Sequence, residues 1–138
     1  LLADTKLAPE LSNEAHYYRA KAYLDAGKTD GAMEDLKILA KDTRNVYGAE
    51  AKYKVAQIYF DGGQTDKAEQ EVLNYIEVST PHTYWLARSF VLLADVYMKS
   101  GRNLDAKQYL LSLKQNYQAD DDIAGMIESR LEKLKTEN

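Results

Sequence analysis

The chain has 138 residues, which suits a single domain, and 45% of them are hydrophobic, which is enough to build a core. Its net charge of −4 and the lack of a basic stripe argue against nucleic-acid binding, and the lack of cysteine excludes disulfides and thiolate metal sites. No run of about 18 apolar residues is present, so no insertion into a membrane is expected. Only two prolines occur, which favours long helices because proline disrupts a helix interior.

Three segments of the sequence, 20–32, 56–68 and 94–106, align with one another without gaps. Each begins and ends with alanine, has a tyrosine three residues after the first alanine, and has a glycine four residues after the tyrosine. The tyrosines are Tyr23, Tyr59 and Tyr97, and the glycines are Gly27, Gly63 and Gly101. Glycine adopts the left-handed conformation that ends a helix at little cost, so each segment predicts a helix, a turn and a second helix. Thr29, Thr65 and Asn103 follow the turns and are candidate caps for the second helices.

The apolar periodicity predicts seven helices, at about 9–26, 29–43, 46–61, 65–79, 82–100, 103–117 and 121–136. The first six make three pairs, over 9–43, 46–79 and 82–117. The seventh has an apolar side formed by Ile123, Ile127, Leu131 and Leu134, which predicts an unpaired helix that covers the end of the stack. The aspartates 120–122 are expected to stabilise its N-terminus, because a calcium loop needs alternating ligands and a central glycine.

The repeated segments resemble the tetratricopeptide-repeat family, whose pattern is W-x2-L-G-x2-Y, then A-x3-F, then P. The third repeat matches as Phe90-x2-Leu93-Ala94-x2-Tyr97, followed by Ala106-x3-Leu110. The repeat tyrosines are 36 and 38 residues apart, more than the roughly 34 of the family. Because the core register is constant, the extra residues are expected between one repeat's second helix and the next repeat. Such long repeats resemble those of bacterial envelope proteins, such as TolA-binding and outer-membrane assembly lipoproteins.

The resemblance implies an all-α fold, a right-handed α-α superhelix of about three helix pairs with a C-terminal capping helix, in one domain over residues 1–138. The envelope resemblance favours a periplasmic or outer-membrane-associated location. The sequence begins with Leu1 rather than methionine, so we expect it to be part of a longer chain. Residues 1–8 are expected either to be disordered or to close a preceding repeat.

The resemblance also implies a concave groove that is lined by the first helix of each repeat. With the repeat tyrosine counted as position eleven, the groove-facing positions are two, five, nine and twelve. They are occupied by Glu14, Tyr17, Lys21 and Leu24, by Glu50, Tyr53, Gln57 and Phe60, and by Arg88, Val91, Asp95 and Met98. All of these except Glu14, Glu50 and Val91 are candidate binding residues.

Two rows of equivalent side chains stand out among these candidates. Tyr17 and Tyr53 share one position, and Leu24, Phe60 and Met98 share another. Aromatic and methionine side chains among mixed charges are typical of peptide-binding surfaces. The alternative is that these side chains pack against the adjacent helix. If the tyrosines bind a ligand, replacing both with alanine should remove binding and leave the fold largely intact.

No pattern for catalysis or cofactor binding is present. His16 and His82 are the only histidines; neither pairs with a cysteine, and neither has a second histidine at metal-ligand spacing. We therefore expect no enzyme activity, cofactor or metal. The leading interpretation is a protein–protein interaction scaffold that binds a peptide or partner protein in the concave groove. A homo-oligomerisation module and a regulatory or docking domain of a larger enzyme are alternatives.

Overall fold

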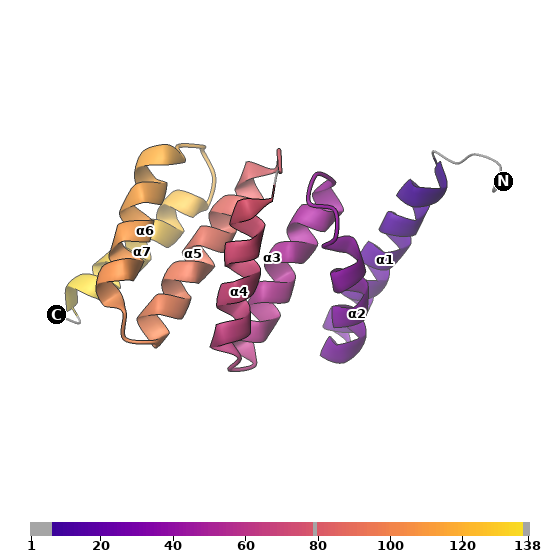
Figure 1. The fold of residues 1–138 in the computed structure, drawn as a ribbon, viewed down its shortest axis with the longest axis horizontal. Helices are drawn as coiled ribbons and strands as arrows, with labels where there is room; N and C mark the ends of the chain where they lie inside the picture. The colour runs from indigo at the N-terminus through magenta and orange to yellow at the C-terminus, as the bar shows by residue number, and fades with distance from the viewer. Residues whose placement is uncertain (1–6, 79, 137–138) are drawn as a thin grey trace.

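The computed structural model describes residues 7–78 and 80–136, which form seven α-helices and contain no strand. The helices are α1 (Leu7–Asp25), α2 (Thr29–Leu39), α3 (Val46–Asp61), α4 (Thr65–Glu77), α5 (Thr83–Lys99), α6 (Asn103–Asn116) and α7 (Ile123–Thr136). Figure 1 shows them along one axis, from α1 at one end to α6 and α7 at the other. The predicted all-α fold is confirmed. Of the segment predicted to close a preceding repeat, residues 1–6 lie outside the described residues.

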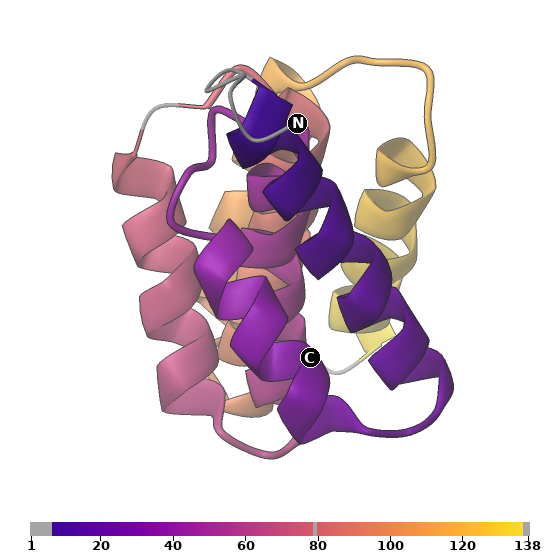
Figure 2. The same ribbon diagram turned by 90° about the vertical axis from the view of Figure 1, so that its right-hand side faces the viewer.

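The helices pack as three pairs, α1 with α2, α3 with α4, and α5 with α6. Successive pairs stack through contacts of α2 with α3 and of α4 with α5. The first helices also contact one another, α1 with α3 and α3 with α5, and α7 contacts α5 in the next place of that row. Figure 2 looks along the stack and shows α4 and α7 on opposite sides of it. The chain is therefore a helical solenoid with two sides, one made by first helices and the other by second helices.

The turn inside each pair depends on its glycine. Gly27, Gly63 and Gly101 have φ values of 75°, 81° and 78°, a region that is unfavourable for residues with a Cβ atom. In every turn the amide after the glycine donates to the carbonyl of the repeat tyrosine, which satisfies a backbone acceptor at the end of the helix. These bonds join Lys28 to Tyr23 at 2.7 Å, Gln64 to Tyr59 at 2.8 Å and Arg102 to Tyr97 at 2.7 Å.

The predicted caps of the second helices are wrong. The N-cap residues are Lys28, Gln64 and Arg102, and none of them makes a side-chain capping hydrogen bond. Each second helix has its N-cap one residue earlier than expected, because the amide of the residue directly after the glycine is already bonded to the carbonyl of the repeat tyrosine. Thr29, Thr65 and Asn103 are therefore the first helical residues. For α7 the predicted role is confirmed for one of the three aspartates, since the Asp121 side chain accepts from the Ile123 amide at 2.9 Å, whereas Asp122 accepts from the Tyr84 hydroxyl.

The second predicted helix ends at Leu39 rather than at residue 43. The chain leaves α2 through short-range hydrogen bonds, in which the amide of Asp42 donates to the carbonyl of Leu39 at 3.2 Å. It then passes so close to the start of α3 that a Cβ atom on Gly48 would lie 1.9 Å from the Asp42 carbonyl oxygen. The linkers 40–45 and 78–82 are longer than the turns inside pairs, so the prediction that the extra residues lie between repeats is confirmed.

The core is built from the repeated alanines and from apolar residues of both helix rows. Ala20, Ala56 and Ala94 are at most 1% exposed, and their small side chains allow the helices to approach closely at these positions. Of the repeat tyrosines, Tyr97 is buried, whereas Tyr23 and Tyr59 are half-buried. The buried Ile123, Ile127 and Leu134 pack α7 against the core of the last pairs. Among the described residues, no helix has the length and hydrophobicity needed to cross a lipid bilayer.

Replacing Ala94 with leucine should lower the free energy of unfolding by about 1–3 kcal/mol, because the fully buried site has no room for a larger side chain. Urea denaturation followed by circular dichroism measures the change. Ala124→Leu, at an exposed position of α7, is the matched control and should change stability little. Equal midpoints for Ala94→Leu and the unaltered protein would contradict the packing.

Candidate functional site

The nine candidate binding residues lie on α1, α3 and α5. We call the side of the solenoid formed by α1, α3, α5 and α7 the first-helix face. On this face the structure divides the candidates into three neighbourhoods, around Tyr17, around Tyr53 and around Phe60. Leu24 lies apart from Phe60 and Met98, in a hollow that it shares with the start of α2 and the end of α3.

Tyr17 lies half-buried between α1 and α3. Its hydroxyl group donates to the Glu50 carboxylate at 3.1 Å, and its ring centroid lies 4.7 Å from that of Tyr47. The Nζ atoms of Lys21 and Lys54 lie 5.3 and 5.9 Å from the ring centroid. Burial raises the pKa of Tyr17 to about 12, and the charge of Glu50 acts in the same direction. The protonated hydroxyl therefore remains a donor that links α1 to α3.

Tyr53 does not present its ring as Tyr17 does, although the two positions are equivalent in sequence. Its side chain is 7% exposed, because α5 covers it. The Trp85 ring centroid lies 5.7 Å from that of Tyr53, and the Arg88 guanidinium carbon lies 5.2 Å from it. The hydroxyl donates to Gln57 at 2.8 Å, and burial raises the pKa of Tyr53. Tyr53 therefore packs against the adjacent helix, which was the alternative to ligand binding for this side chain.

Phe60, Asp95 and Met98 come together in one pocket, which we call the α3–α5–α7 pocket. Its volume is about 540 Å³, and its other lining residues are Lys99, Ser129, Arg130 and Lys133. Asp95 accepts two hydrogen bonds from the Arg130 guanidinium, at 2.7 and 3.0 Å. The Lys99 Nζ atom lies 5.6 Å from the Phe60 ring centroid. The pocket thus has apolar walls, a neutralised acid and a cationic rim.

Sequence reasoning missed the contribution of α7 to this pocket, because it treated the last helix only as a cover. The register contained a signal, since Arg130 follows its partner Asp95 by 35 residues, about one repeat. Trp85 was missed for a different reason. It lies before the part of the third repeat that the family pattern covers, so nothing in that pattern drew attention to it.

The two histidines act in contacts between elements. The Nδ1 atom of His16 lies 2.8 Å from the carboxylate of Asp35, which is 1% exposed and also accepts from Arg19 at 2.6 and 2.8 Å. The Arg19 guanidinium holds the pKa of Asp35 below its usual range, and His16 adds to this effect. The Nε2 atom of His82 lies 3.0 Å from the Arg44 carbonyl oxygen.

Within residues 7–78 and 80–136, no group of three or more potential ligands could hold a metal ion.

A family model described as tetratricopeptide repeat matches residues 14–42, which include most of α1 and all of α2. The match supports the resemblance seen in the sequence, and the helix pairs of the solenoid are consistent with it. Tetratricopeptide repeats generally mediate protein–protein interaction. No curated protein and no solved structure gives a significant match. The bacterial-envelope subtype and the location that it implies stay predictions.

The different environments of the two tyrosines predict unequal effects of their removal. Tyr53→Ala should lower the free energy of unfolding by about 3–5 kcal/mol, because it leaves a cavity beneath Trp85 and Arg88. Tyr17→Ala should cost about 1 kcal/mol, since it removes a partly exposed contact with Glu50. Denaturant titrations of the single variants measure both values. A double variant as stable as the unaltered protein would restore the original expectation that both rings are dispensable for folding.

Asp35→Asn should lower the free energy of unfolding by about 1.5–3 kcal/mol at pH 7, because a buried charge-assisted network loses its acceptor. The folded pKa of Asp35 is depressed, so its stabilising effect is present above the unfolded pKa of about 3.9 and is lost as the pH falls through the folded pKa. The difference from the unaltered protein should therefore shrink below about pH 4. Urea titrations at pH 7 and pH 3 measure this, with the exposed Asp25→Asn as control. A difference that stayed constant with pH would exclude the ionic role.

Proposed function

We propose that this chain is a non-catalytic scaffold for protein–protein interaction, which binds a peptide segment of its partner on the first-helix face. The observation that carries the proposal is the α3–α5–α7 pocket. Three of the nine candidate residues line it together, and they come from two successive repeats. Its volume of about 540 Å³ can accommodate at least one large side chain of a partner.

The pocket is held in place by the packing beneath it. Phe60 and Met98 are half-buried and pack against the core cluster, so their positions are fixed before a ligand arrives. The two hydrogen bonds between Asp95 and Arg130 connect α5 to α7 across the pocket. A preformed apolar site saves the entropy of ordering on binding, which favours an apolar anchor residue in the partner.

The charged rim supports a further preference. Asp95 is already paired with Arg130, whereas Lys99 and Lys133 are exposed. Acidic residues beside the apolar anchor would thus meet cations that are accessible to them. The homo-oligomerisation module and the docking domain of a larger enzyme stay predictions, because no contact in the described residues distinguishes them.

A library of short random peptides displayed on phage, panned against the protein, tests this function. We expect the selected peptides to share a large apolar residue. For such a peptide, Met98→Ala should raise the Kd at least about thirtyfold, since an anchor contact typically contributes about 2 kcal/mol or more. Isothermal titration calorimetry measures the Kd.

Met126→Ala is the control, because Met126 is half-buried on α7 but lies outside the lining of the pocket. It should leave the Kd unchanged, and melting curves should show that both variants are folded. Recovery of no peptide, or the same Kd for Met98→Ala and the unaltered protein, would argue against the first-helix face as the binding site.

A further inference from the structure

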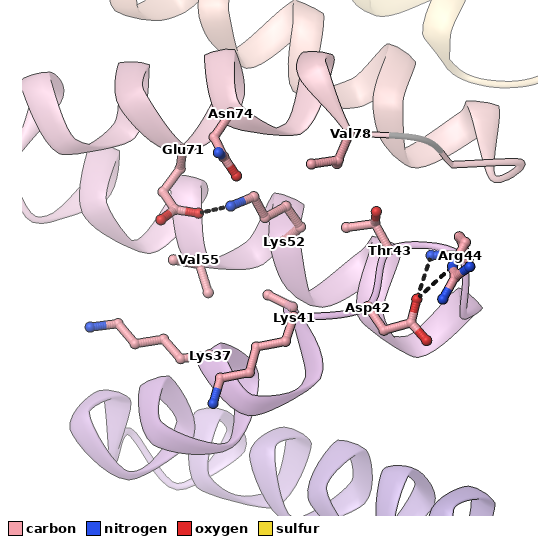
Figure 3. A pocket seen from close by; sticks show the side chains of 11 residues that line it. Lys37, Lys41, Asp42, Thr43, Arg44, Lys52, Val55, Glu71, Asn74 and Val78 are labelled. Carbon is pink, nitrogen blue, oxygen red and sulfur yellow. Dashed lines mark hydrogen bonds and ion pairs between the residues drawn. The ribbon is translucent and has the colours of Figure 1, made fainter.

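A second hollow lies on the opposite side of the solenoid, between the second helices of the first two repeats. We call it the second-helix cleft. Its volume is about 680 Å³, and its lining residues are Lys37, Ala40, Lys41, Asp42, Thr43, Arg44, Lys52, Val55, Glu71, Asn74 and Val78. Figure 3 shows α2 along one side of it, α4 along the other and α3 behind. In the described part of the chain α2 and α4 do not contact each other, which leaves this space open.

The linker 40–45 closes one end of the second-helix cleft and is firmly attached. The Thr80 hydroxyl donates to the Thr43 carbonyl at 2.7 Å, and the His82 ring nitrogen lies 3.0 Å from the Arg44 carbonyl. Both contacts connect this linker to the next one, 78–82. The longer spacing of these repeats therefore builds a fixed end wall, so the cleft exists before any ligand binds.

The acidic side chains of the cleft are already engaged by basic neighbours. Glu71 pairs with Lys52 at 2.8 Å, and Asp42 pairs with Arg44 at 3.4 Å. Figure 3 shows both interactions, on opposite parts of the cleft. Neither carboxylate is therefore left to neutralise the two remaining lysines of the lining.

Lys37 lies in the last turn of α2, and Lys41 follows four residues later in the linker 40–45; both are exposed. Among the described residues the Lys41 ammonium group has no partner, and that of Lys37 has only the Tyr59 ring, whose centroid lies 5.7 Å from its Nζ atom. Across the cleft, Asn74 on α4 brings an amide group with two further donors. The cleft thus combines accessible cations and donors, in a chain whose net charge is −4.

We propose that the second-helix cleft binds an extended acidic segment of a partner protein, at a site separate from the first-helix face. A volume of about 680 Å³ exceeds what a single small anion fills, and the donors stand on two different helices. Val78, which is 39% exposed, adds apolar surface at one end of the cleft, against which the aliphatic part of a glutamate side chain can pack. Salt bridges with Lys37 and Lys41 orient the segment along the C-terminal end of α2 and the start of the linker 40–45.

A fluorescently labelled oligoglutamate peptide is the probe, with binding followed by anisotropy at low and at physiological ionic strength. We expect saturable binding that weakens with salt, as contacts between exposed charges do. Lys37→Gln/Lys41→Gln should raise the Kd by about tenfold, because two exposed ion pairs are lost. Lys28→Gln/Lys107→Gln, which removes the same charge from exposed positions outside the cleft, should leave the Kd nearly unchanged.

The proposal is overturned if the unaltered protein does not bind oligoglutamate, if both double variants weaken binding equally, or if inorganic phosphate at equal charge displaces the peptide completely. Amide chemical-shift changes on binding should centre on Thr43, Asn74 and Val78. Lys99→Gln/Lys133→Gln, which removes the exposed cations of the α3–α5–α7 pocket, should retain full oligoglutamate binding, and its loss would instead place the acidic peptide on the first-helix face.

Discussion

The hydrogen bond from the residue after each turn glycine to the carbonyl of the repeat tyrosine is the constraint on which the rest of the fold depends. It occurs at Tyr23, Tyr59 and Tyr97 with nearly the same length, and each time it requires a glycine with positive φ. A fixed turn gives each pair the same geometry, so equivalent alanines meet at each close helix contact. Three such pairs stack without any specific connection between distant repeats.

The linkers between helix pairs differ from one another, whereas the turns inside the pairs are alike. Inside a pair the turn leaves little freedom, but between pairs the chain has additional residues to place. The linker 40–45 is pressed against the start of α3, where only a glycine fits at position 48, and it is bonded to the following linker through Thr80. Because α2 ends at Leu39, the linker 40–45 and not a longer helix occupies the end of this space. In the described residues α2 does not contact α4, and the second-helix cleft lies between them.

The last helix, α7, both covers the end of the core and lines the α3–α5–α7 pocket. By packing against α5 and α6 it covers apolar side chains, as a terminal helix of a solenoid must. Because α7 follows α5 in the row of first helices, it also brings Arg130 to Asp95 and Lys133 to the rim of the α3–α5–α7 pocket. The proposed peptide site is thus built where the row of first helices ends, and α7 adds Lys133 to the cationic rim that Lys99 of α5 begins.

The sequence by itself determined the seven helices and the glycine turns, because these follow from local backbone preferences repeated in a constant register. It also assigned Phe60, Asp95 and Met98 to one face, together with Leu24, which the structure places in a separate hollow. It did not determine that Tyr53 is covered while Tyr17 is half-exposed, since this depends on Trp85 and Arg88 from the next repeat. Equivalent positions in sequence differ in space when their neighbours differ. Only the tertiary structure decided which side chains face a pocket, because burial and pairing are set by residues that are distant along the chain.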